Sequence, residues 1–142
     1  MNNSEARKEL IKICGAKCFI EELGLRTKEE VESELRLYGK GQRQVMDTLT
    51  YHHIVDRCKG GQTSLENGAV LRNINHRWFN RLSPKQQEEI NKLFIEYKKQ
   101  FYKECKVEAV EGIDLGFSAR GIILTLEEQK ELHREIIEEI RY

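Results

Sequence analysis

The stretch from Leu49 to Leu82 reads LTYHHIVDRCKGGQTSLENGAVLRNINHRWFNRL and differs in texture from the charged sequence on either side. A β-prone run from Leu49 to Val55 precedes a Gly-Gly loop, and a second apolar run follows at Ala69 to Leu71. Asn73 is a helix-capping residue type, and a helical pattern follows it from Ile74 to Leu82. The stretch therefore predicts a hairpin of two strands followed by a helix.

Three of the four histidines fall in this stretch, as the adjacent pair His52-His53 and as His76. Asn67 lies between the two predicted strands, and Asn80 shares a helix face with His76 because it lies four residues later. Successive side chains of a strand point to opposite faces, so His52 and His53 cannot both face one ion squarely. We expect either a distorted strand end or a phosphate held between a metal ion and a water molecule.

The segments that contain these residues resemble the HNH nuclease motif. The matching segments are Tyr51-His52-His53-Ile54-Val55, Lys59-Gly60-Gly61, Leu65-Glu66-Asn67 and His76. In that family, which includes colicin-type DNases and the cutting domains of some RNA-guided nucleases, a ββα unit binds one divalent metal ion and hydrolyses phosphodiester bonds. The resemblance covers about thirty residues.

The resemblance also implies a role for each matching position. His53 and Asn67 are the implied catalytic residues, His53 as the general base on water and Asn67 as a brace for the loop between the strands. His52 and His76 are the implied metal ligands, with Asn80 as a further ligand.

These residue types suit phosphodiester hydrolysis. A divalent ion can stabilise charge on the leaving oxygen, and imidazole, with an ordinary pKa of about 6.5, can deprotonate water at neutral pH. We expect Mg²⁺ with water and phosphate completing its shell, and Mn²⁺, Ni²⁺ or Zn²⁺ as alternatives. The predicted helix N-terminus close to His76 also favours an anion such as phosphate.

The flanking sequence predicts helices on both sides of this unit. Ser4 is expected to cap a first helix that ends near Gly15. Thr27 with Glu30 forms a capping box for a second helix that ends at Gly39.

On the C-terminal side, Ser83 and Pro84 open a long helix, and Thr125 with Glu128 opens another. The long helix has an apolar stripe formed by Ile90, Leu93, Phe94, Tyr97 and Phe101. Residues 107–123 have little periodicity and predict a loop.

A chain of 142 residues fits one hydrophobic core. We therefore expect a single α+β domain over residues 1–142. It would consist of a helical part at 1–48, a ββα core at 49–82 and a second helical part at 83–142.

The overall charge is balanced, with 24 basic and 24 acidic residues, but the middle of the chain is basic. Residues 36–81 contain eight basic and three acidic residues, a local balance of +5. Such a segment is consistent with phosphate binding, although it equally describes a solvated surface. The candidate nucleic-acid contacts are Arg43, Arg57, Lys59, Arg72, Arg77 and Arg81.

Cys14 and Cys18 resemble half of a structural zinc site, but their C-x3-C spacing is followed by no second pair after His76. We therefore do not expect Zn²⁺ there unless the fold brings Cys58 and Cys105 to them. We find no signal peptide and no apolar run long enough to cross a bilayer, so we expect a cytoplasmic protein without a membrane partner.

We predict a metal-dependent endonuclease that nicks DNA. One base and one metal ion cut one strand at a time, so cleavage of both strands would need a dimer or two encounters, and the sequence does not set the oligomeric state. Two alternatives belong to other classes. One is a catalytically silent HNH-fold module that binds nucleic acid or protein, such as an inhibitor of a defence system, and the other is a zinc-stabilised interaction protein.

Overall fold

The computed structural model describes residues 1–102, which contain helices and two strands. The helices that precede the strands are α1 (Asn3–Cys14), α2 (Phe19–Glu22), α3 (Lys28–Leu35) and α4 (Lys40–Met46). The remaining elements are β1 (Leu49–His53), the short 3₁₀ helix η1 (Arg57–Lys59), β2 (Gly68–Arg72), α5 (Asn73–Asn80) and α6 (Pro84–Phe101).

The two strands form an antiparallel pair in which His52 lies opposite Ala69 and His53 lies opposite Gly68. Helix α5 begins directly after β2, so the predicted order of hairpin and helix is confirmed. A small antiparallel sheet among helices is compatible with the predicted α+β class.

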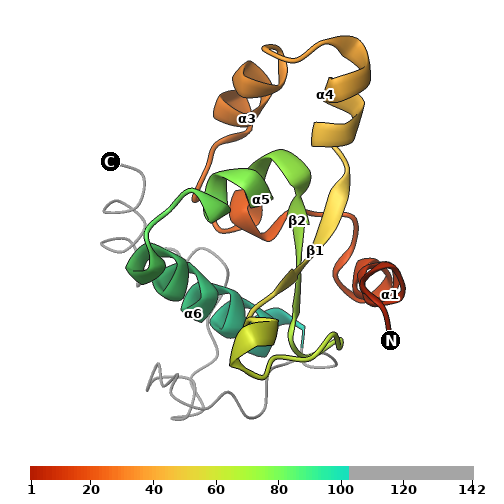
Figure 1. Cartoon of the computed structure of the whole chain (residues 1–142), viewed down its shortest axis with the longest axis vertical. Coiled ribbons are helices and arrows are strands. Elements are labelled where there is room, and N and C mark those ends of the chain that lie inside the picture. The colour runs from red at the N-terminus through yellow and green to blue at the C-terminus, as the bar shows by residue number, and fades with distance from the viewer. Residues whose placement is uncertain (103–142) are drawn as a thin grey trace.

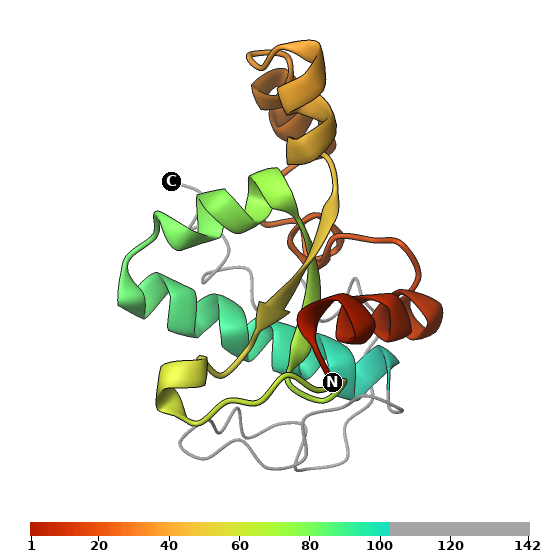
Figure 2. The ribbon, with the colours of Figure 1, turned by 45° about the vertical axis from the view of Figure 1, so that its right-hand side comes forward.

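The two-stranded sheet lies between helices. Figure 1 shows α1 on one side of the strands and α5 with α6 on the other, and Figure 2 shows the same arrangement from a second direction. The main core lies where these elements meet. It includes Leu10 of α1, Phe19 of α2, Leu71 of β2, Phe79 of α5 and Phe94 of α6.

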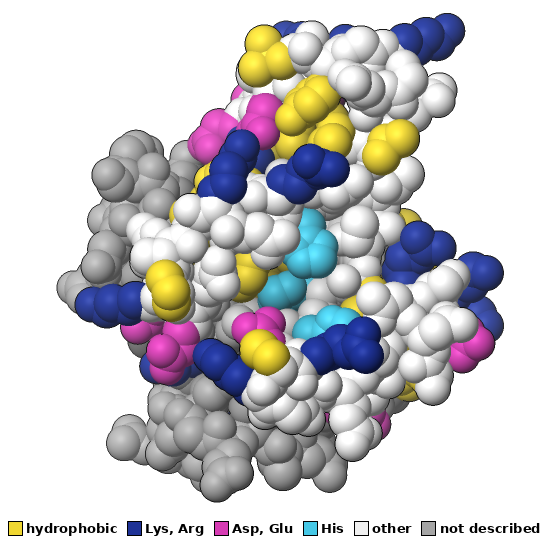
Figure 3. Space-filling model, viewed as in Figure 1, with side chains coloured by type: hydrophobic (Ala, Val, Ile, Leu, Met, Phe, Trp, Pro, Cys, Tyr) yellow, Lys and Arg dark blue, Asp and Glu magenta, His cyan; other side chains and the backbone are white. Residues whose placement is uncertain are grey.

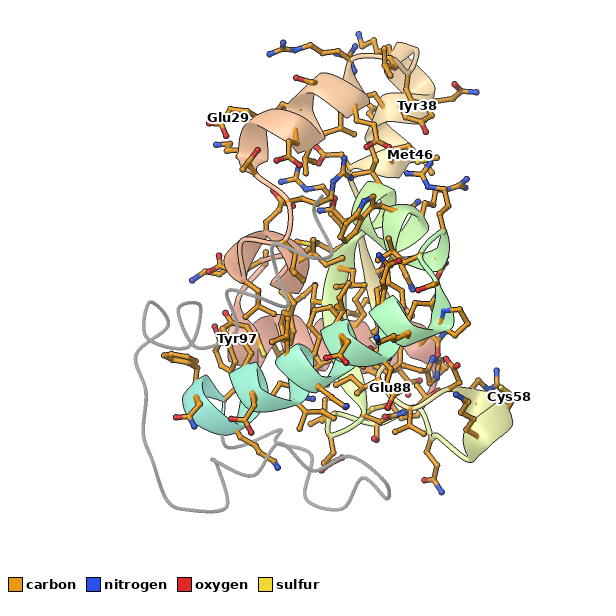
Figure 4. All side chains as sticks on the ribbon, turned by 90° about the vertical axis from the view of Figure 1, so that its left-hand side faces the viewer. Glu29, Tyr38, Met46, Cys58, Glu88 and Tyr97 are labelled. Atoms are coloured by element: carbon orange, nitrogen blue, oxygen red, sulfur yellow. The ribbon has the colours of Figure 1, made fainter. Side chains whose placement is uncertain are left out.

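Helices α3 and α4 form a lobe at one end of the molecule (Figures 1 and 2). A second, smaller core holds this lobe on α5, and it consists of Val31, Leu35, Met46 and Ile74 with Tyr38 packed against it. Figure 4 labels Tyr38 and Met46 at this end of the molecule. The lobe therefore has a small core of its own, distinct from the main core.

Several predicted helix ends are wrong by a few residues. Helix α1 is capped by Asn2, whose side chain accepts from the backbone N–H of Glu5, whereas Ser4 lies inside the helix. Helix α5 begins at Asn73 with Arg72 as its N-cap residue, because the Asn73 side chain donates to the carbonyl of Val45 instead of capping.

The second predicted helix is also shorter than expected. Thr27 caps α3 as predicted, but α3 ends at Leu35, and Gly39 precedes α4 instead of ending α3. The sequence pattern did not predict α4, whose Met46 packs into the small core, or the four-residue α2. Both are short elements held by tertiary contacts, which local sequence does not display.

Helix α6 begins at Pro84, as predicted, and a capping box between Ser83 and Gln86 satisfies its first turn. Its apolar stripe ends differently from the prediction, because Phe101 is 37% exposed while Lys98 is buried. The predicted loop at 107–123 and the predicted helix at Thr125 lie outside the described residues. Among residues 1–102, no helix has the length and apolar character that a membrane crossing requires.

Candidate functional site

The histidines of the described chain lie close to one another on the sheet and on α5. Figure 3 shows histidine side chains gathered near the middle of one face, with Lys and Arg side chains around them. His52 and His76 are 5.2 Å apart between ring centroids, with nearly perpendicular rings. His53 stands on the other face of β1, so the alternation expected of a strand separates the two neighbouring rings.

The ring of His52 is part of the core. Its side chain is 4% exposed and lies edge-on to Phe79 and Phe94, with ring centroids 4.7 and 5.7 Å away. Burial lowers the pKa of His52 to about 3, opposed by the hydrogen bond to Asn91. Burial also lowers the pKa of His76, and the charge of His53 lowers it further. Both rings are therefore neutral at neutral pH.

The hydrogen bonds around His52 and His76 fix the tautomer of each ring. His52 Nε2 lies 2.8 Å from Asn91 Oδ1, an amide oxygen that can only accept, so Nε2 carries the proton. His76 Nδ1 lies 2.9 Å from Thr50 Oγ1, and the single hydroxyl proton of Thr50 is donated to the Leu71 carbonyl at 2.8 Å. Thr50 must therefore accept from His76 Nδ1–H.

It follows that His52 Nδ1 and His76 Nε2, which face each other at 3.4 Å, both present lone pairs. Two facing lone pairs repel unless a cation lies between them. Two imidazole nitrogens bound at about 2.1 Å to one tetrahedral cation lie about 3.4 Å apart. The spacing, the tautomers and the hydrogen bonds on the outer nitrogens therefore fit a divalent metal ion.

The other predicted ligand, Asn80, is the last residue of α5 and is exposed, and its side chain makes no hydrogen bond within residues 1–102. Over the same residues, no cluster of three or more His, Cys, Asp or Glu side chains is arranged to hold a metal ion. The described chain thus offers two imidazoles, and the part of Asn80 in coordination stays a prediction.

His53 is half-buried at the end of β1. Its Nε2 lies 2.9 Å from Thr63 Oγ1 in the loop, and its ring lies edge-on to Tyr51 at 4.8 Å between centroids. Burial lowers the pKa of His53, the positive charge of Arg57 lowers it further, and Asp56 opposes both. An imidazole that is neutral at physiological pH and partly exposed can accept a proton from water.

Asn67 joins the two ends of the loop between the strands. Its Oδ1 accepts from the backbone N–H of Val55 at 2.8 Å, and its Nδ2 donates to the carbonyls of Val55 and Gln62 at 3.0 and 2.8 Å. These are the contacts of a loop brace, and Asn67 is buried where it makes them.

Lys98 of α6 supports the same loop, and the sequence pattern did not predict it. Its ammonium group is buried and donates to the carbonyls of Leu65, Glu66 and Gly68 at 2.6, 2.7 and 2.7 Å. A buried charge with several hydrogen bonds is tolerated where an unpaired one would be expensive. Helix α6 therefore fixes the loop through Lys98 and fixes His52 through Asn91.

Thr50, Thr63 and Asn91 are further residues that the sequence reasoning missed. Thr50 lies two residues before His52 and therefore on the same face of β1, which is a signal that strand periodicity carries. Asn91 interrupts the apolar residues of α6 beside Ile90. Thr63 lies in an irregular loop and has no such signal.

The six basic residues predicted to contact nucleic acid divide into two groups. Arg72 pairs with Glu21 at 3.2 Å, with Asp47 at 3.3 Å and with Glu32 at 3.7 Å. Arg81 pairs with Glu34 at 3.6 Å, and Arg43 donates to the carbonyls of Leu35 and Tyr38. Arg57, Lys59 and Arg77 are exposed and have no ion pair within residues 1–102. This second group is the one available to phosphates.

Three of the four cysteines lie within the described residues. Cys14 and Cys18 are buried, and burial raises the pKa of Cys18. Cys58 is exposed on η1 at the outer edge of the molecule (Figure 4). Cys105 lies outside the described residues, so the prediction about a four-cysteine zinc site stays a prediction.

No protein-family model, curated protein or solved structure matches this chain.

Proposed function

We propose that this protein is a divalent-metal-dependent endonuclease that nicks DNA, with an HNH-type ββα unit formed by β1, β2 and α5. The single observation that carries the proposal is that His52 Nδ1 and His76 Nε2 face each other at 3.4 Å while Asn91 and Thr50 contact the outer nitrogens of the two rings. A site of this kind beside a partly exposed histidine supports hydrolysis more than packing.

The residues of the chain divide the work between the two faces of β1. His52 and His76 would hold the ion, and Asn91 and Thr50 keep their outer nitrogens protonated. When bound, a divalent ion supplies charge stabilisation at the leaving oxygen of the phosphodiester. His53, on the opposite face of the strand, takes the proton from the attacking water.

DNA is the proposed substrate because the site is bordered by basic residues without acidic partners in the described chain. The positive charge of Arg57 lowers the pKa of His53, which indicates that this guanidinium lies near the proposed base. Arg77 extends from the helix that contains His76. Contacts of this kind to phosphate oxygens position a duplex without reading its sequence.

A plasmid assay tests the proposal. Purified wild-type protein and His53→Ala are incubated with supercoiled plasmid and each of Mg²⁺, Mn²⁺, Ni²⁺ and Zn²⁺, with a chelator as the blank. The proposal expects metal-dependent conversion of supercoiled to open-circular DNA by wild type, reduced by about 10²- to 10⁴-fold in the variant. Equal inactivity of both proteins, with DNA or protein binding retained, would support the catalytically silent module instead.

A further inference from the structure

The ring of His53 belongs to a short chain of hydrogen bonds that reaches the start of α1. Thr63 Oγ1 lies 2.9 Å from His53 Nε2 and donates to Asn3 Oδ1 at 3.2 Å. A hydroxyl group has one proton, and here that proton is directed to Asn3. The Thr63 oxygen must therefore accept from His53 Nε2–H, which leaves Nδ1 as the unprotonated nitrogen of this ring.

The ring is also held against rotation. Tyr51 lies edge-on to His53, and the Tyr51 hydroxyl donates to the Ser64 carbonyl at 2.8 Å and accepts from the Ser64 N–H at 3.0 Å. Thr63 and Ser64 are consecutive residues of the loop. The loop therefore fixes the Nε2 edge of the imidazole directly through Thr63, and the ring plane through Ser64 and Tyr51. Within residues 1–102, His53 Nδ1 has no hydrogen-bond partner.

The start of α1 is itself ordered by a reciprocal cap. Asn2 Oδ1 accepts from Glu5 N–H at 2.9 Å, and the Glu5 carboxylate accepts from Asn2 N–H at 3.4 Å. This cap fixes the backbone next to Asn3, whose side chain receives the Thr63 proton. Two segments sixty residues apart in the sequence thus meet at the proposed base.

We propose that Thr63 and Asn3 are positioning residues that hold His53 with its proton on Nε2, so that Nδ1 is the atom that accepts the proton of the attacking water. This inference rests on the proposed nuclease function. In the step, the water oxygen forms the new bond to phosphorus and its proton goes to Nδ1. The bond from phosphorus to the leaving sugar oxygen breaks, that oxygen takes a proton from solvent, and Nδ1 later returns its proton to solvent.

The test compares Thr63→Val, which keeps the shape and removes the hydroxyl, with Thr63→Ser, which keeps the hydroxyl. At saturating DNA and metal, Thr63→Val is expected to lower kcat by about 10- to 100-fold while KM and metal affinity stay within about twofold. Thr63→Ser restores kcat to near the wild-type value. Asn3→Ala has a smaller effect because Asn3 is exposed. In a His53→Ala background, Thr63→Val causes no further loss.

Two results would overturn the inference: a kcat of Thr63→Val within twofold of wild type, or an equal loss with and without His53. A second measurement does not need turnover, because long-range ¹H–¹⁵N spectra of the imidazoles report which ring nitrogen carries the proton. The Nε2–H form of His53 in wild type, lost in Thr63→Val, supports the inference, and the Nδ1–H form in wild type contradicts it. Absence of nicking by wild type with the Nε2–H form present would count against the nuclease function and leave the tautomer assignment standing.

Discussion

The two faces of strand β1 hold their histidines in different ways. On the helix face, His52 is buried between Phe79 and Phe94, and its outer nitrogen is bound by Asn91 of α6. On the loop face, His53 is partly exposed and is held by Thr63. One face is fixed by the packed core and the other by an irregular loop.

This difference corresponds to the two tasks of a hydrolytic site. A metal ligand must keep its geometry before the ion arrives, and burial with a hydrogen bond on the outer nitrogen provides that. A general base must meet water, so it needs support that leaves one nitrogen open. The loop that supplies this support is fixed in turn by Asn67 and Lys98.

The largest expected effect comes from breaking the loop face at Gly61. A Cβ at Gly61 would lie 1.7 Å from the Val55 carbonyl oxygen, which accepts a hydrogen bond from Asn67, so the backbone of the loop must move. We expect Gly61→Ala to destabilise the protein by about 3 kcal/mol and to abolish nicking.

The matched control is Gly41→Ala in α4, where a Cβ meets nothing within 4 Å. This change should stabilise the protein by about 0.5–1 kcal/mol, because alanine favours a helix over glycine. Urea unfolding of the two variants measures both effects. Equal stability of the two variants would show that the loop does not depend on the close approach at Gly61.

The helix face is tested by removing the acceptor of His52. Asn91→Ala leaves His52 Nε2–H without a partner and frees the ring to change tautomer, so metal affinity should fall by about 10- to 100-fold. Asn91→Asp keeps an acceptor of the same shape and should retain metal affinity. Titration calorimetry with Zn²⁺ compares the variants, and equal affinities for all three proteins would separate Asn91 from the metal site.

Acid should destabilise the metal-free protein mainly through the helix face. As pH falls through about 6.5, the unfolded chain takes up a proton at His52, but the folded chain does not until about pH 3, so stability is lost across this window. Between pH 7.5 and pH 5 the expected loss is about 2 kcal/mol. Denaturant unfolding in chelator measures it. His53→Ala should keep most of this acid sensitivity. Loss of the sensitivity in that variant would show that it comes from His53 and not from His52.

The smallest expected effect concerns DNA affinity. Arg77→Ala should lower the slope of log affinity against log salt concentration by about 1, because one phosphate contact is lost. Arg72→Ala should leave this slope unchanged, since Arg72 is engaged by Glu21, Glu32 and Asp47. Fluorescence anisotropy over a salt series measures both slopes. A slope lowered by Arg72→Ala and unchanged by Arg77→Ala would show that Arg72, and not Arg77, contacts phosphate.

The sequence predicted the elements whose signals are local. The hairpin followed from two β-prone runs around a Gly-Gly loop, and α6 followed from Ser83, Pro84 and an apolar stripe. The histidine cluster also followed from spacing along the chain. The strands and α6 depend on neighbours within about one helical turn or one strand repeat, whereas the histidine cluster joins residues 24 positions apart and followed from their places in the predicted hairpin and helix.

The sequence did not reveal the contacts that join distant segments. Asn91 contacts His52, 39 residues earlier, and Lys98 contacts Leu65, 33 residues earlier. Neither residue type indicates such a partner in the sequence. Lys98 is not part of the predicted apolar stripe of α6 and is nevertheless buried, because loop carbonyls bind its ammonium group. Tertiary contacts determine the burial of such side chains. They also determine that a second helix, α4, forms after Gly39.

Metal binding between His52 Nδ1 and His76 Nε2 is measured by titrating the purified, metal-free protein with Co²⁺ and following its visible absorption. We predict one bound ion per chain in wild type and loss of that ion in His76→Ala, which removes one of the two nitrogens while Thr50 stays bonded to the Leu71 carbonyl. Absence of Co²⁺ binding by wild type, or undiminished binding by His76→Ala, would contradict this prediction.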